Sequence, residues 1–380
     1  MARVYLDHAS TSPPRPEAVH AVRAWFDLPA ADPGRLHEEG RINRDALEQA
    51  RQEVAGLIGA AAREVVFTSG ATEAINDAVW GATRAHPGGP VLCAAVEHSA
   101  VRDASVRLAD TETLPVDGEG RIDADALAAR LAAPALPRPA LVHCQWANHE
   151  VGTLQPVARV VELCRAAGVP VHVDAAAACG HVPMDLGVLG ADLVSLSAHK
   201  LGGVPGAGAL VIRRGSRFEP LIVGGEQERG RRGGLEALPA LVAFGAAAAA
   251  LAADRTLARE AGKARAQIAA AVAGTQTVDG VEVVGPAAPG DRVPHLVCLG
   301  VGGVEAEPVL IGLDRAGVAV HSGSACSSES IEPSPVLEAM GADPSHSLRV
   351  SVGWSTTDGD IAAFGDAFRR VVGELRALRG

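Results

Sequence analysis

The stretch VHVDAAAACGHVPMDLGVLGADLVSLSAHKLGG, residues 171–203, decides the predicted fold class of this chain. Its first apolar run ends at Asp174, and a second apolar run ends shortly before Lys200, 26 residues further on. Short apolar runs between turn residues predict buried strands. Because open α/β sheets bind ligands beyond the carboxyl ends of their strands, we expect Asp174 and Lys200 at the edge where chemistry takes place.

The same pattern recurs on both sides of this stretch. Other short apolar runs bounded by turn residues are EVVFTSG, GPVLCAAV, ALVHCQWAN and GALVIRRG. Between them, ATEAINDAVWGATRA and QPVARVVELCRAAG space their apolar residues three and four apart, which is typical of helices. The alternation predicts an α/β fold with a mostly parallel sheet covered by helices on both faces.

The second half of the chain predicts a smaller domain. Residues from Leu235 to about Val272 are expected to be helical throughout and to connect the two domains. Two strand-like pieces, GVEVVG and HLVCLGV, follow this helix. We expect a large domain over 17–256 and a small domain built from 1–16 and 257–380.

Composition excludes several classes of protein. The chain carries 45 acidic and 34 basic side chains spread along its length, which argues against a nucleic-acid-binding surface. MARVYLDHAS has an aspartate where an export signal needs an apolar core, and LVAFGAAAAALAA is shorter than the roughly 20 residues that cross a bilayer. We therefore expect a cytoplasmic protein with no membrane span. Its six irregularly spaced cysteines predict free thiols, with neither a disulfide framework nor a metal site.

Asp174 and Lys200 together indicate a cofactor. A lone lysine after a strand is more often an ordinary surface residue. Pyridoxal phosphate, however, needs a lysine for its Schiff base and a carboxylate that keeps the pyridinium nitrogen protonated. The presence of both residues therefore favours a pyridoxal-phosphate site over the interpretation of Lys200 as an ordinary surface residue.

Two further motifs fit that cofactor. FTSGATEAIND places Ser69, Gly70, Ala71 and Thr72 between a strand and a helix start, where backbone N–H groups and the helix dipole favour a phosphate. Taken alone, the turn is better explained as an ordinary helix cap, with a threonine followed by a glutamate. His98 follows another strand and is placed to stack on a planar ring or to shuttle protons, although a lone histidine is more often structural.

The segment HSGSACSSES, residues 321–330, sets Cys326 among small and polar neighbours. Such neighbours cannot bury a thiol, whereas a cysteine with a packing role sits among apolar side chains. A loop of serine, glycine and alanine is also not expected to hold the thiol in one position.

Together and in this order, the segments resemble the cysteine desulfurase family of fold type I pyridoxal-phosphate enzymes, in its branch with a long mobile SGSAC loop. The matching segments are YLDHASTSP, EVVFTSGATEAIND, VEHSAV, WANHEVGTLQP, residues 171–215, GGEQERGRRGG, HSGSACSSESIEPSPVLEAMG and SLRVSVG. The resemblance implies a large domain with a mostly parallel seven-stranded sheet, a smaller α+β domain, and a homodimer. It also implies removal of sulfur from L-cysteine, giving L-alanine and a persulfide for transfer to an acceptor.

The resemblance further implies a role for each matching residue. Lys200 forms the Schiff base and moves the α-carbon proton, Asp174 pairs with the pyridinium nitrogen, and His98 stacks on the ring. Phosphate contacts fall to Gly70, Ala71, Thr72, Ser197 and His199, a ring-oxygen contact to His149, and substrate binding to Arg349 and Asn148. Cys326 attacks the substrate sulfur, and His98 or the substrate amine takes the proton of the thiol.

Four positions depart from the family pattern around the cofactor. His149 stands where the family has an asparagine, and Ala177 replaces a glutamine. Histidine is still able to donate to a ring oxygen, whereas alanine is not. Gly233 and Leu235 replace a serine and a threonine that reaches the phosphate of the neighbouring subunit. Arg229, Arg231 and Arg232 are the candidates to compensate.

Three interpretations stay open at this point. The first is a cysteine desulfurase, and the second is another pyridoxal-phosphate reaction, such as a selenocysteine lyase or C–S lyase or a step of secondary metabolism. The third is a weakly active homologue that serves as a scaffold. Fold and family do not name the sulfur acceptor, for which an iron–sulfur scaffold and a thiolation enzyme are the expected classes.

Overall fold

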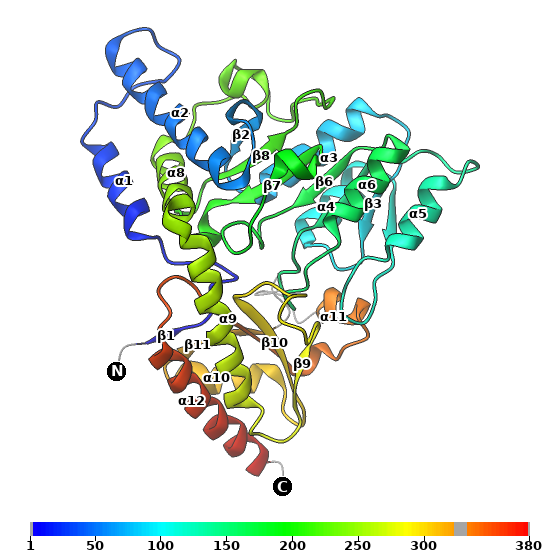
Figure 1. Cartoon of the computed structure of the whole chain (residues 1–380), viewed down its shortest axis with the longest axis vertical. Coiled ribbons are helices and arrows are strands. Elements are labelled where there is room, and N and C mark those ends of the chain that lie inside the picture. Colours follow the sequence, from blue (N-terminus) through cyan, green and yellow to red (C-terminus); the bar gives the residue numbers. More distant parts are fainter. Residues whose placement is uncertain (1–2, 323–332, 379–380) are drawn as a thin grey trace.

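The computed structural model describes residues 3–322 and 333–378 of the chain. Its largest element is a seven-stranded sheet in the upper part of Figure 1, with strand order β2-β8-β7-β6-β5-β3-β4. Strand β8 is antiparallel to both of its neighbours, and the other pairs are parallel. The strands are β2 (Val65–Thr68), β3 (Val91–Ala94), β4 (Thr111–Leu114), β5 (Leu141–Gln145), β6 (Val171–Asp174), β7 (Leu193–Ser197) and β8 (Gly208–Ile212). The predicted mostly parallel sheet is confirmed.

Helices cover both faces of this sheet, as the alternating pattern of its strands requires. In β2, Val66 packs with α3 (Ala71–Ala85) and α4 (Ser99–Leu108) on one face. Its neighbours Val65 and Phe67 point to the other face, because successive side chains of a strand alternate. That second face is covered by α1 (Pro16–Phe26), α2 (Glu38–Ile58), α5 (Ala124–Ala132), α6 (Val157–Ala167) and α8 (Leu238–Ala252). A short α7 (Leu186–Leu189) lies between β6 and β7 in the chain.

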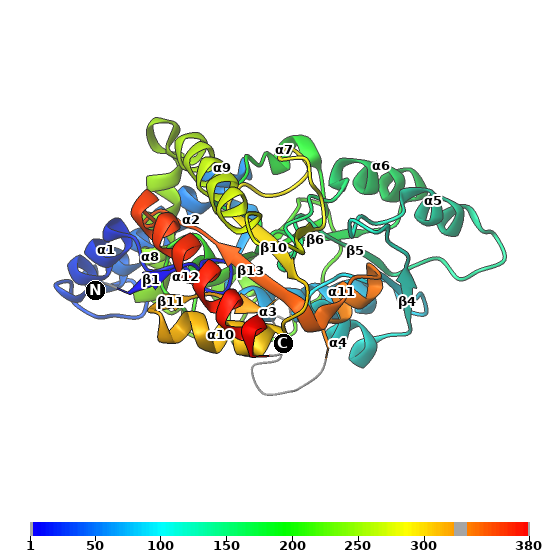
Figure 2. The same ribbon diagram turned by 90° about the horizontal axis from the view of Figure 1, so that it is seen from below.

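A second sheet forms the lower part of the molecule. It is antiparallel, with order β12-β13-β10-β9, and β1 (Val4–Tyr5) pairs separately with β11 (Val318–Ala319). Its strands are β9 (Val281–Val284), β10 (Leu296–Val301), β12 (His321–Ser322) and β13 (Ser347–Ser351). The helices of this part are α9 (Thr256–Thr275), α10 (Ala306–Arg315), α11 (Pro335–Ala339) and α12 (Asp358–Ala377), and α12 packs against α9 and α10 (Figure 2). A separate apolar core joins this sheet to α9, α10 and α12, as expected for an α+β unit, whereas α11 packs in the core of the large sheet. The domain boundaries stay a prediction.

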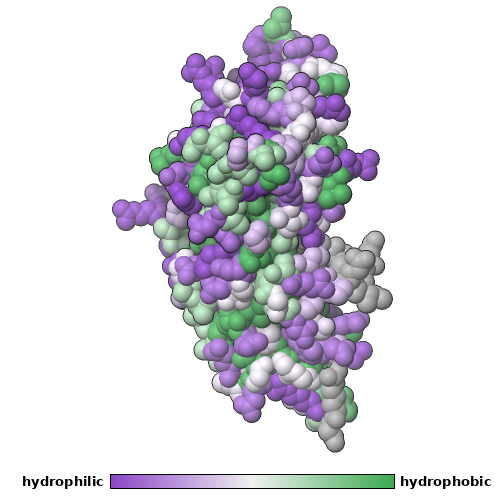
Figure 3. Space-filling model, turned by 90° about the vertical axis from the view of Figure 1, so that its right-hand side faces the viewer, coloured by the Kyte–Doolittle hydropathy of each residue, from purple (hydrophilic) through white to green (hydrophobic). Residues whose placement is uncertain are grey.

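The prediction of one continuous helix from Leu235 to about Val272 is wrong. The structure has α8 and α9, separated by a short turn at Ala253–Arg255 in which Asp254 and Arg255 have positive φ angles. That turn contains neither glycine nor proline, so the sequence carries no signal for the break. By length and composition Leu238–Thr275 is able to span a membrane, but α8 packs against α1 and α2 within the first core. The face drawn in Figure 3 mixes hydrophobic with hydrophilic side chains.

A buried ion pair fixes the segment at Gln227–Gly230 to the edge of the large sheet. Arg51 on α2 donates to Glu228 through Nη1 at 2.5 Å and Nη2 at 2.7 Å, and Glu228 also accepts from the Phe67 N–H. Both charged side chains are almost fully buried. Glu228 and Arg229 have positive φ angles, so the ion pair holds a strained backbone in place.

Replacing Arg51 with alanine should lower the free energy of unfolding by about 3 to 5 kcal/mol, because it leaves the Glu228 carboxylate buried and unpaired. Urea denaturation at neutral pH measures this change. The matched control is Arg159→Ala, which breaks an exposed ion pair with Glu162 and should cost less than about 1 kcal/mol. Equal effects of the two substitutions would show that the Arg51–Glu228 pair does not hold the segment.

Candidate active site

A cavity of about 480 Å³ opens at the carboxyl ends of β5, β6 and β7. Twelve of the residues named from the sequence line it: Ser69, Gly70, Ala71, Thr72, His98, His149, Asp174, Ala177, Ser197, His199, Lys200 and Arg349. Ser10, Glu73 and Gln145 also line the cavity and were missed. Asn148 lies outside this lining, and Cys326 lies outside the described residues.

Adjacent strands bring Asp174 and Lys200 to this cavity. Asp174 ends β6, and its Oδ1 accepts from the Ala176 N–H at 2.9 Å and from the Ser195 hydroxyl at 3.0 Å. Ser195 is the β7 residue paired with Asp174 in the sheet. Lys200 follows the end of β7 within the helical turn Ala198–Lys200. The carboxylate is therefore fixed by the sheet before any ligand binds.

Glu97 is a second buried carboxyl group near Asp174, and the sequence analysis missed it. Its side chain is fully buried, and Oε1 accepts from the Gln145 N–H at 2.7 Å. Burial, followed by the charge of Asp174, raises the pKa of Glu97 to about 8. Glu97 is therefore largely protonated at neutral pH, and Asp174 carries the negative charge of this pair.

The turn between β2 and α3 has the geometry of an anion cradle. Gly70 is the N-cap of α3, and a Cβ atom on Gly70 would meet no atom within 4 Å, so the space before the helix is open. A Cβ on Gly208 would lie 2.5 Å from the carbonyl carbon of Gly70, so only glycine lets β8 approach the turn. The first turn of a helix has N–H groups without intrahelical acceptors, and these favour an anion.

The Glu73 carboxylate occupies one N–H donor of this cradle and places a negative charge beside it. Its Oε2 accepts from the Ser69 N–H at 2.8 Å, and its Oε1 accepts from Arg232 Nε at 2.9 Å. Arg232 thus neutralises a carboxylate that would repel a phosphate. Leu235, in the position of the family's threonine, is exposed. Of the three arginines expected to compensate, Arg232 is joined to the cradle through this ion pair.

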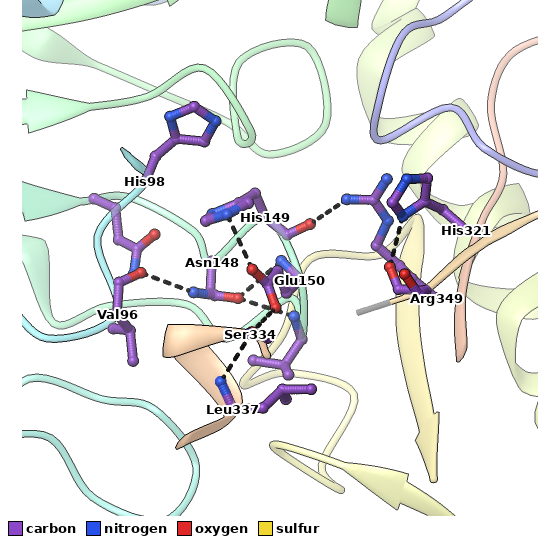
Figure 4. Close-up of polar contacts among 12 residues, drawn as sticks. Val96, His98, Asn148, His149, Glu150, His321, Ser334, Leu337 and Arg349 are labelled. Carbon is purple, nitrogen blue, oxygen red and sulfur yellow. Dashed lines mark hydrogen bonds and ion pairs between the residues drawn. The ribbon is translucent and has the colours of Figure 1, made fainter. Parts of the chain in front are cut away.

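Two histidines on the cavity wall face each other edge-on. His98 is the N-cap of α4, and its Nδ1 accepts from the Ala100 N–H at 3.1 Å, which places the proton of the neutral ring on Nε2. The ring centroids of His98 and His149 are 4.8 Å apart with an interplanar angle of 64° (Figure 4). His199 is neutral at pH 7, because burial and the neighbouring Lys200 lower its pKa to about 4.

Arg349 reaches the cavity from the second sheet. Its Nη1 donates to the carbonyl of His149 at 2.9 Å, and its Nη2 donates to Asp7 Oδ1 at 2.9 Å and to Ser10 Oγ at 2.5 Å. Its Nε has no hydrogen-bond partner among the residues that the structure describes. A substrate carboxylate at Arg349 therefore shares the guanidinium with Asp7.

The side chain of Asn148 forms hydrogen bonds to backbone groups. Its Nδ2 donates to the carbonyl of Val96, and its Oδ1 accepts from the N–H groups of Glu150 and Val151. These contacts fix the turn that presents His149. The substrate-binding role of Asn148 stays a prediction.

Three histidines that the sequence analysis did not single out lie behind Lys200. The rings of His181 and His295 stack at 3.5 Å, and His181 Nε2 lies 3.3 Å from the Lys200 carbonyl oxygen. Burial lowers the pKa of His181 to about 3 and that of His8 to about 4, and it holds that of His295 well below the usual range. The cluster is neutral at pH 7 and adds no positive charge beside the lysine.

Comparisons with known proteins agree with this geometry. The Aminotransferase class-V family matches residues 4–364. A protein of Cereibacter sphaeroides named cysteine desulfurase is 40% identical over 389 residues, which cover 100% of this chain and 98% of the relative. The chain belongs to the cysteine desulfurase family.

Solved structures give the same fold. A NifS-like protein from Rickettsia africae ESF-5 has a TM-score of 0.88 at 26% identity, covering 98% of this chain and 99% of that chain. The protein SspA, solved in complex with cysteine, has a TM-score of 0.75 at 26% identity, covering 92% and 99% respectively. The resemblance and the α/β fold predicted from the sequence are confirmed.

The cysteine desulfurase family depends on pyridoxal phosphate, and the residues of this cavity fit that cofactor. A cavity of about 480 Å³ is within the range of small-molecule sites. Asp174 supplies a fixed carboxylate for a ring nitrogen, Lys200 an amine, and Gly70 an open helix start for a phosphate. The assignment of individual roles to these residues stays a prediction.

The raised pKa of Glu97 predicts a pH dependence of stability. Between the ordinary carboxyl pKa and about 8, the folded state keeps a proton that the unfolded state releases. The contribution of Glu97 to the free energy of unfolding should therefore fall as the pH rises, by about 1.4 kcal/mol per pH unit. In urea denaturation from pH 5.5 to 7.5, the difference between the wild type and Glu97→Gln, which cannot ionise, should follow this slope, because the buried histidines contribute equally to both proteins.

The exposed residue Glu162 on α6 provides the control, because Glu162→Gln should leave the slope of the wild type unchanged. Parallel pH profiles for the wild type and Glu97→Gln would mean that Glu97 is ionised in the folded protein. Asp174 would then not be the sole charge of the pair.

Proposed function

We propose that this chain is a cysteine desulfurase that binds pyridoxal phosphate, converts L-cysteine to L-alanine and retains the sulfur as a persulfide on Cys326. The supporting observation is that Asp174, Lys200 and Arg349 line one cavity in a chain of this family. SspA, a structural relative, was solved with cysteine bound, which supports cysteine as the substrate.

Pyridoxal phosphate, when bound, supplies an electron sink that stabilises negative charge at the substrate α-carbon. Asp174 would accept a hydrogen bond from the protonated ring nitrogen and so keep the proton on the ring, because Ser195 and Ala176 fix the carboxylate. Lys200 Nζ takes the proton from the substrate α-carbon and returns it. The cradle at Gly70, Ala71 and Thr72, with Ser197 and His199, holds the phosphate.

Arg349 orients the substrate by its carboxylate. A guanidinium pairs with a carboxylate through two parallel N–H groups, which sets direction as well as position. The Cys326 thiolate then forms a bond to the substrate sulfur while the carbon–sulfur bond breaks, and the bonding electrons stay with the carbon fragment. Protonation of that fragment gives alanine, and the sulfur stays on Cys326.

The described cysteines support Cys326 as the acceptor because all of them are buried. Burial raises the pKa of their thiols, to about 12 for four of them and further for the fifth, so they are protonated at neutral pH. These residues are Cys93, Cys144, Cys164, Cys179 and Cys298.

The test is a single turnover with L-cysteine, followed by measurement of alanine and by mass spectrometry of the cysteine peptides. The wild type should form one alanine per active site and carry the extra sulfur on Cys326. Cys326→Ser should bind the cofactor normally and lose at least about 100-fold in alanine formation, because a hydroxyl is a far weaker nucleophile toward sulfur.

Cys179→Ala is the matched control and should retain the activity of the wild type. Sulfur found on a buried cysteine would contradict the role of Cys326. Pyruvate and sulfide in place of alanine would favour a C–S lyase, the second candidate, which the unusual cavity residues His149 and Ala177 support. The scaffold interpretation requires that neither product forms.

We further propose that the enzyme is a cytoplasmic homodimer that passes its persulfide sulfur to an acceptor protein. Exposed apolar side chains at Val223 and Leu235 flank the segment of residues 224–234, as expected where a second subunit packs. Sedimentation at micromolar concentration should give about twice the mass of the chain. Val223→Asp, which places a charge on this surface, should shift the distribution toward monomer, and an active wild-type monomer would contradict the proposal.

A further inference from the structure

His149 and Glu150 form a buried pair beside the cavity (Figure 4). His149 Nε2 lies 3.5 Å from Glu150 Oε1, and the two side chains are only 6% and 3% exposed. His149 lines the cavity, whereas Glu150 lies behind it. The pair therefore places an imidazole between a carboxylate and the space that receives the ligand.

Among the described residues, the ion pair of Glu150 is the one with His149. Its Oε2 accepts from the Ser334 hydroxyl at 2.5 Å, and its backbone N–H donates to Asn148 Oδ1. Within residues 3–322 and 333–378, no ion pair joins Glu150 to a lysine or an arginine. A buried carboxylate is costly unless a positive charge compensates it, and the His149 ring is the basic group in reach.

Other contacts hold His149 in position. Its carbonyl accepts from Arg349 Nη1 at 2.9 Å, and its ring lies edge-on to His98. Because Nε2 is directed to Glu150, Nδ1 is the nitrogen left for a ligand. An unpaired Arg349 would disfavour a positive charge on His149, but Arg349 is itself paired with Asp7. The negative charge of Glu150 therefore favours a positive charge on the His149 ring.

We propose that Glu150 is a positioning residue that stabilises a doubly protonated His149, so that the Nδ1–H of His149 donates to an anionic oxygen of the bound ligand. This inference rests on the proposed function, in which that oxygen is the ring hydroxyl oxygen of the cofactor. The proton that leaves the ligand hydroxyl moves to Nδ1 of His149, and the total charge is unchanged.

The positively charged imidazolium of His149 then lies between two negative groups, the Glu150 carboxylate and the ligand oxygen. A charge-assisted hydrogen bond of this kind is stronger than a bond between neutral groups. An asparagine at this position, as in the family pattern, donates without a charge and needs no carboxylate behind it. With His149 at this position, the charge of Glu150 affects ligand binding. With an asparagine there, Glu150 would contribute only to the local structure.

A double-mutant cycle tests the proposal, with cofactor affinity measured by equilibrium titration of pyridoxal phosphate. Glu150→Gln keeps an oxygen acceptor for Ser334 but removes the charge. It should weaken cofactor binding roughly 10- to 100-fold in the presence of His149. In the His149→Asn background the same substitution should change affinity less than about twofold, because only a charged partner couples to Glu150.

The protonation state gives a readout independent of activity and affinity. With ¹⁵N-labelled histidine, the cofactor-loaded wild type should show both ring nitrogens of His149 protonated, and His149→Asn assigns the signal. In Glu150→Gln one nitrogen should lose its proton. Asp123→Ala is the structural control, because it removes the side-chain N-cap of α5 and should lower thermal stability while leaving the His149 signal unchanged.

Equal losses from Glu150→Gln in both backgrounds, with a neutral His149 in the loaded wild type, would overturn the inference. Alanine formation by that same wild type would leave the proposed function standing. Failure of the wild type to bind pyridoxal phosphate would overturn both.

Discussion

The fixed negative charge of Asp174 is the constraint on which the site depends. It sits where β6 ends, held by a hydroxyl from β7 and by the backbone of its own turn. A buried carboxylate beside a second acid is tolerated only if one of the two is neutral. Burial keeps the proton on Glu97, so a single charge faces the cavity.

The sheets supply the rest of the site around that charge. Parallel pairing of β6 with β7 brings Lys200 to the same edge as Asp174, and the β2–α3 turn adds an open helix N-terminus. Arg349 comes from the second sheet and reaches the cavity beside Asp7 and Ser10, which belong to the N-terminal segment. Substrate recognition therefore requires the two sheets to keep a fixed relative position.

Local sequence patterns were sufficient for the strands and helices next to the cavity. The apolar runs at β5, β6, β7 and β8 are confirmed, and α3 begins after Gly70 as the turn residues predict. Strand β4 was missed, because its sequence TETL is polar and it lies at the sheet edge. Because β4 is largely not buried, it lacks the continuous apolar signal of β2, the buried strand at the opposite edge.

Long-range contacts explain what the sequence analysis missed in the site. Glu97 follows an apolar strand, and only the fold shows that it is buried near Asp174. The contact of His149 with Glu150, and of Glu150 with Ser334, joins residues whose proximity no spacing rule predicts. Asn148 was assigned by resemblance to substrate binding, yet its side-chain hydrogen bonds are made to the backbone.

The central claim is that Asp174 and Lys200 hold one pyridoxal phosphate between them, and borohydride reduction of the cofactor-loaded protein tests it most directly. The chain has two lysines, Lys200 and Lys263, so peptide mapping has a built-in control. Lys263 on α9 donates to the Thr356 carbonyl at 2.6 Å, away from the cavity lining. The account predicts a pyridoxyl group on Lys200 alone, and weaker labelling at limiting cofactor in Asp174→Asn. A label on Lys263, or no label on either lysine, would contradict it.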